Sequence, residues 1–143
     1  TNVLLRALHR TLPLHLECRQ LIAQVRADGY TPWVSRQVIR EYLVQVTRPG
    51  GMLIEPLAGE QAERQVHLIE RMFVVADETK SVTDHLMELI RDYPTGGKQI
   101  HDANIVATML AFDIDTLLTL NEADLKRFAG IIMLRTLTAS EDL

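Results

Sequence analysis

QIHDANIVATMLAFDIDTLLTLNEADLKRF, residues 99–128, is the stretch of sequence from which the fold can be predicted. Small and apolar residues recur at helical spacing from Ala103 to Ala111, which predicts a helix that packs closely against a neighbour. Asp102 is expected to cap the start of that helix. The apolar run 116–120 then predicts one buried strand, followed by a short helix that Asn121 opens and Asp124 supports in a pair resembling a capping box. A helix, a buried strand and polar residues at the end of the strand are half of a parallel α/β unit.

The rest of the chain repeats this alternation. Periodicity and capping residues predict helices over 14–25, 35–46, 59–72 and 79–90, and short apolar runs predict strands at 31–34, 73–76 and 130–134. Trp33 is expected in the core. The alternation predicts an α/β fold: a three-layer α/β/α Rossmann-like sandwich around a mainly parallel sheet of about four to five short strands, with right-handed crossovers.

Composition narrows the class of protein. The 143 residues suit a single domain over 1–143, and an apolar fraction of 47% supports a packed core. Cys18 is the only cysteine, so the chain has no internal disulfide and a reducing compartment is expected. No apolar run approaches the ~20 residues that a membrane span needs, and no signal peptide is evident. We therefore expect a cytoplasmic protein without a membrane segment, whose net charge of −4 gives no overall attraction to nucleic acid.

Acidic residues follow the predicted strands. Glu41 comes after the strand at Trp33, Asp102 opens the helix that feeds the sheet, and Asn121 and Asp124 follow the strand at 116–120. Because the carboxyl ends of parallel strands share one edge of a sheet, we expect these side chains to converge there. Oxygen ligands without cysteine or paired histidine favour a hard cation, so the sequence predicts an Mg²⁺ or Mn²⁺ site.

Four short motifs carry a family resemblance. They are Thr1-Asn2-Val3-Leu4-Leu5, Ser35 with Glu41, His101-Asp102-Ala103, and Thr119-x-Asn121-x-x-Asp124. In this order, the motifs resemble those of the PIN-domain nucleases, and most of all the VapC-type toxins of bacterial toxin–antitoxin pairs. The resemblance covers nearly the whole chain.

The resemblance implies a PIN-like fold and cleavage of RNA with Mg²⁺ or Mn²⁺. Glu41 and Asp102 would be catalytic acids and metal ligands, with Asn121 at the position of a fourth ligand and Asp124 as a weaker one. Asn2 matches the small polar residue after the family's first acid, and Thr119 matches the threonine that faces the site. The family's first acid would directly precede Thr1, so we expect the first strand upstream of this sequence. The implied partners are an RNA substrate, a small antitoxin protein and a second copy of the chain in a homodimer.

Each candidate also has a simpler interpretation. Glu41 fits an exposed helix acid, Asp102 and Asn121 fit plain helix caps, and Asp124 fits a partner of the helix dipole. The three basic residues Arg36, Arg40 and Lys98 fit either RNA phosphate contacts or a solvated surface. A helical face of Glu63, His67 and Glu70 has ligand types but no evident fourth ligand.

Two other functions are also compatible with the sequence. A non-catalytic PIN-like domain that binds RNA or protein would also fit the sequence. A nuclease acting on DNA is the third possibility.

Overall fold

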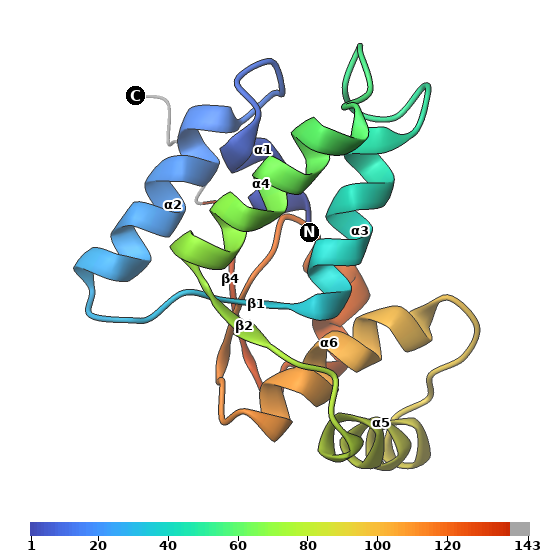
Figure 1. Ribbon diagram of the computed structural model, residues 1–143. Helices are drawn as coiled ribbons and strands as arrows, with labels where there is room; N and C mark the ends of the chain where they lie inside the picture. The colour runs from blue at the N-terminus through green and yellow to red at the C-terminus, as the bar shows by residue number, and fades with distance from the viewer. Residues whose placement is uncertain (138–143) are drawn as a thin grey trace. The chain divides into compact units, whose positions relative to one another are not determined.

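The computed structural model describes residues 1–137 (Figure 1). The chain divides into two compact units. The first unit covers Thr1–Asp77 and the second Glu78–Leu143. The positions of the units relative to one another are not determined, so each is described by itself. The prediction of a single domain stays a prediction.

The first unit contains helices and one parallel pair of strands. Its elements are α1 (Asn2–Leu8), α2 (His15–Ala27), β1 (Trp33–Ser35), α3 (Arg36–Thr47), α4 (Gly59–Met72) and β2 (Val74–Ala76). Helix α1 packs against α2, and α3 packs against α4. Strands β1 and β2 run side by side, with Trp33 opposite Val74 and Ser35 opposite Ala76 (Figure 1). The core is drawn from all four helices, with Leu5, Cys18, Tyr42, Val46 and Ile69 fully buried.

Local chemistry explains where α2 ends and α3 begins. Gly29 follows α2 with φ +88°, a conformation that glycine adopts without a steric penalty. The Ser35 side chain accepts a hydrogen bond from the Val38 backbone N–H at 3.1 Å, which confirms the predicted N-cap of α3. Because Ser35 is also the last residue of β1, the strand leads directly into the helix.

The described part of the second unit, residues 78–137, contains α5 (Lys80–Asp92), α6 (Gln99–Ala111), β3 (Thr116–Leu118), the 3₁₀ helix η1 (Ala123–Phe128) and β4 (Met133–Arg135). Helix α6 packs against α5, and its small residues Ala103 and Ala107 are fully buried in the core, as predicted. Phe128 of η1 lies in the same core and meets the Tyr93 ring edge-on, with centroids 5.4 Å apart. Strands β3 and β4 pair in parallel, with Thr116 opposite Met133.

Each unit therefore contributes one two-stranded parallel sheet, β1–β2 in the first and β3–β4 in the second. The predicted α/β class, the parallel pairing and the alternation of helices with short strands are confirmed. None of the helices in residues 1–137 combines the length and apolar character needed to cross a membrane.

Two apolar residues at the start of the helix predicted over 14–25 are exposed. Leu14 and Leu16 are 42% and 64% exposed, whereas Leu21, Ile22 and Val25 are buried. Leu14 has φ +62° and is the N-cap of α2, so the helix begins only at His15. The buried stripe of α2 therefore begins at Cys18, one turn into the helix.

The prediction that Trp33 lies in the core is also wrong. It is the first residue of β1 and is 36% exposed, and its strand partner Val74 is 41% exposed. Burial in β1 begins at Val34, so the first residue of the strand lies at the edge of the buried region, where a large apolar side chain need not be buried.

Candidate functional site

Glu41 lies on α3 and is half-buried, so it is not the ordinary exposed acid of the simpler interpretation. The Gln37 amide Nε2, one helical turn earlier, donates a hydrogen bond to Oε1 at 2.8 Å. The Thr1 hydroxyl donates to Oε2 of the same carboxylate. Both oxygens therefore accept a hydrogen bond from a neutral group. These two bonds fix the direction of the carboxylate, and neither donor group is a cation.

Gln37 is a partner of Glu41 that the sequence analysis did not identify. Only 4% of it is exposed, although it is polar and sits among the apolar residues of the buried face of α3. Its spacing of four from Glu41 was the available signal, because residues four apart are neighbours on a helix.

Tyr42, the residue after Glu41, is also held by a contact with another helix. The Tyr42 hydroxyl and His9 Nε2 are 2.8 Å apart, and the two rings stack with centroids 5.8 Å apart. Tyr42 is fully buried, and burial raises its pKa to about 12. Burial lowers the pKa of His9, and the nearby His15 lowers it further. The pair joins the C-terminal end of α1 to α3.

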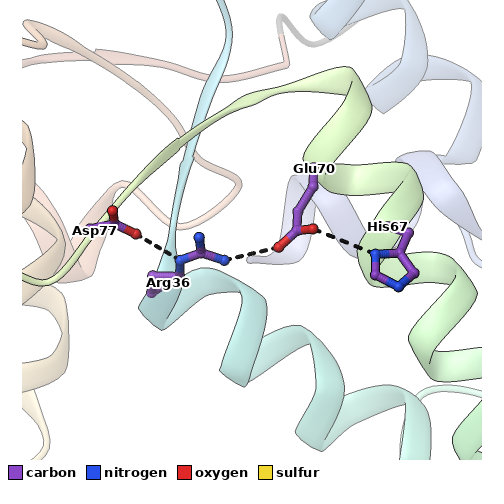
Figure 2. Close-up of polar contacts among 4 residues, drawn as sticks. All are labelled: Arg36, His67, Glu70 and Asp77. Atoms are coloured by element: carbon purple, nitrogen blue, oxygen red, sulfur yellow. Dashed lines mark hydrogen bonds and ion pairs between the residues drawn. The ribbon is translucent and has the colours of Figure 1, made fainter.

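Arg36, predicted as an RNA contact, forms two ion pairs within the first unit. Figure 2 shows its guanidinium between two carboxylates: Nε is 2.9 Å from Asp77 Oδ1, and one Nη is 3.0 Å from Glu70 Oε1. His67 Nδ1 lies 3.6 Å from the other oxygen of Glu70. A phosphate at Arg36 would have to compete with both acids, so the main structural role of Arg36 is to join the start of α3 to α4 and to the end of β2.

Asp102, in the second unit, does not cap α6. The helix begins at Gln99 with Lys98 as its N-cap, and Asp102 lies in the first turn, half-buried. The early start follows from the turn before it, because Gly97 has φ +58° and the Gly96 N–H donates to Gln99 Oε1 at 3.2 Å. A carboxylate in the first turn still faces the positive end of the helix dipole.

Thr119, Asn121 and Asp124 are brought together after β3. The Asn121 backbone N–H donates to Thr119 Oγ1 at 3.0 Å, and the Asn121 side-chain amide donates to Asp124 Oδ2. Asn121 does not open η1, since Glu122 is its N-cap and no side chain bonds there. The predicted cap at Asn121 is wrong, but its predicted partner Asp124 is correct.

The remaining predicted residues lie on the surface. Asn2, the first residue of α1, is exposed, and so are Arg40 on α3 and Lys98 before α6. Exposure suits contact with a backbone phosphate and equally suits solvation, so their RNA-binding role stays a prediction.

The donor chemistry fits a hard divalent cation, but neither unit by itself completes a site. Glu41 in the first unit and Asp102, Asn121 and Asp124 in the second offer oxygen ligands of the kind that Mg²⁺ and Mn²⁺ take. Within residues 1–137, no three His, Cys, Asp or Glu side chains are grouped so that they could hold a metal ion. That includes the helical face of Glu63, His67 and Glu70. The predicted meeting of Glu41 with Asp102 stays a prediction.

The fold is similar to that of chains in two solved structures. One is the crystal structure of VapBC2 from Rickettsia felis bound to a DNA fragment from their promoter, with 18% identity, TM-score 0.62, and coverage of 96% of this chain and 95% of that one. The other is VapBC-1 from nontypeable Haemophilus influenzae, with 13% identity, TM-score 0.58, and coverage of 97% and 87%. No family model and no curated protein matches the sequence. The likeness confirms the predicted PIN-like α/β fold and, at the level of fold, the resemblance seen in the sequence motifs.

Proposed function

We propose that this chain is a VapC-like PIN-domain toxin, an endoribonuclease that cleaves RNA with Mg²⁺ or Mn²⁺. The observation that carries the proposal is the Glu41 carboxylate, half-buried and held by neutral donors on both oxygens. The likeness in fold to VapBC chains supports the toxin class, since it extends over nearly the whole of this chain. The activity would take place in the cytoplasm.

In this proposal Glu41 and Asp102 are metal ligands, with Asn121 as a further ligand and Asp124 as a weaker one. A bound divalent ion would lower the pKa of a water molecule and stabilise negative charge on the phosphodiester. The chain's own residues would orient the carboxylates and position the RNA. The exposed Arg40 and Lys98 would contact phosphates, and Asn2 and Thr119 would line the site beside them.

The test is cleavage of a labelled RNA by the full-length protein, with Mg²⁺, with Mn²⁺ and with EDTA. We expect Glu41→Gln and Asp102→Asn each to lower kcat by at least about 100-fold, because each removes a charged metal ligand. Asp113→Asn is the matched control. Asp113 has φ +55°, which asparagine also adopts readily, and it follows α6 outside the proposed site. Full activity in both acid variants would refute the assignment.

The same assay separates the alternatives. RNA binding without cleavage would favour the non-catalytic domain, and preferential cleavage of a DNA strand of the same sequence would favour a DNA nuclease.

We also propose a small antitoxin partner, by analogy with the VapBC structures, and a homodimer, which the resemblance of the sequence motifs implies. Co-purification with the product of an adjacent small gene tests the first proposal, and sedimentation of the protein alone tests the second.

A further inference from the structure

We propose that Gln37 is a positioning residue, which aims the Glu41 carboxylate at a divalent cation. The inference rests on the proposed function, in which Glu41 is a metal ligand. Its basis is the hydrogen bond from Gln37 Nε2 to Glu41 Oε1 at 2.8 Å, made by a side chain that is 96% buried.

A glutamine at this buried helix position needs an explanation. The neighbouring buried positions of α3 hold Ile39, Tyr42 and Val46, and burial of an amide costs free energy unless its polar atoms find partners. An apolar residue of similar length would fill the same space without that cost. The hydrogen bond that the amide donates to Glu41 therefore gives a reason for a glutamine at this position.

The bond restricts a side chain that would otherwise be mobile. The terminal torsion of glutamate is broad, so a free carboxylate samples many directions. Gln37 holds one oxygen while Thr1 holds the other, and this leaves the second lone pair of each oxygen with a defined direction. Hydrogen bonds of this kind to a ligating carboxylate typically change metal affinity by about 10- to 100-fold.

Two other acids of the first unit show a different arrangement. Glu70 and Asp77 are paired with the guanidinium of Arg36, so their charge is matched by a cation. Gln37 and Thr1 orient Glu41 through an amide and a hydroxyl, which are both neutral donor groups. Orientation by neutral donors is what a carboxylate needs if its charge is to attract a metal ion.

The test is binding of Mn²⁺ alone, measured from the electron paramagnetic resonance signal of the free ion. Gln37→Met keeps the length of the side chain and removes the donor, and we expect affinity for Mn²⁺ to fall about tenfold. In the RNA assay, excess Mn²⁺ should restore kcat in Gln37→Met and fail to do so in Glu41→Gln. Gln45→Met, two turns further along α3, is the matched control and should bind Mn²⁺ like the wild type.

A second variant tests the position of the carboxylate. Gln37→Glu combined with Glu41→Gln keeps the composition, the net charge and an amide–carboxylate pair, but moves the carboxylate by one helical turn. We expect this double variant to melt below the wild type, because the carboxylate moves to a position that is only 4% exposed. Measured well below its melting temperature, it should bind Mn²⁺ as weakly as Glu41→Gln does.

Wild-type affinity for Mn²⁺ in Gln37→Met or in the double variant, with loss in Glu41→Gln, would overturn the positioning role and leave the proposed function standing. Absence of Mn²⁺ binding by the wild type would instead overturn the proposed function, and this inference with it.

Discussion

The cap of α3 gives the most direct quantitative prediction, because that helix carries both Gln37 and Glu41. Ser35 Oγ accepts the Val38 N–H at 3.1 Å, and Ser35 is only 7% exposed. In Ser35→Ala the N–H would lose its partner at a place where water has little access. Loss of an N-cap costs about 0.5–2 kcal/mol, and burial puts this case near about 1.5 kcal/mol.

The loss should appear as a fall in melting temperature of about 4–8 °C, at roughly 4 °C per kcal/mol for a chain of this size. Urea unfolding followed by fluorescence would measure the free energy directly, since Trp33 is the only tryptophan and lies two residues before the cap. Ser35→Thr, which keeps the hydroxyl, should retain most of the stability.

The chain offers a matched control for this cap. Thr79 is the N-cap of α5, but its side chain makes no capping hydrogen bond and it is exposed. We expect Thr79→Ala to change the free energy of unfolding by less than about 0.5 kcal/mol. Equal losses in Ser35→Ala and Thr79→Ala would refute the reasoning, because the structure gives a bond to only one of them.

Four further predictions concern ion pairs, the titration of two side chains and a turn. Arg36→Met should lower the urea midpoint slightly at low salt and leave it unchanged in about 1 M NaCl, because the pairs with Glu70 and Asp77 are exposed and screened; an equal loss at both salt concentrations would contradict this. The pKa of His9 is lowered in the folded state, so the unfolded chain binds more protons and stability should fall as the pH drops below about 6.5, a dependence that His9→Gln should weaken. The pKa of Tyr42 is raised to about 12, so stability should also fall as the pH rises from about 10 towards 12, and Tyr42→Phe should flatten that limb of a denaturation series. Gly97→Ala should cost about 1 kcal/mol in thermal unfolding because φ is +58°, whereas Gly96→Ala, whose added Cβ meets open space, should be nearly neutral.

The features predicted correctly from the sequence are those that local chemistry determines. The cap at Ser35 needs only a hydroxyl and an N–H three residues away, and the close packing of α6 needs only small residues such as Ala103 and Ala107 at helical spacing. The start of α6 was misplaced because Asp102 looked like a cap, whereas the positive φ of Gly97 allowed the helix to begin at Gln99.

The candidate site was predictable in its residue types and less so in its contacts. Glu41 was chosen from its motif, and its half-burial agrees with a site residue. The partners of Arg36 are 34 and 41 residues away, and no local pattern signals contacts at that separation. The Thr1 bond to Glu41 spans 40 residues and was equally hidden.

These long-range bonds couple α1 to the candidate site. Thr1 at one end of α1 binds Glu41, and His9 at the other end binds Tyr42, the next residue of α3. A helix of seven residues is not stable alone, so α1 depends on these bonds and on its buried residues Leu4 and Leu5. The coupling works in both directions: whatever loosens α1 frees one oxygen of Glu41, and whatever removes the Glu41 carboxylate weakens the hold on α1. The direction of this carboxylate therefore depends on the folded first unit as a whole. For that reason a sequence motif can identify Glu41 as a candidate but cannot reveal its hydrogen-bond partners.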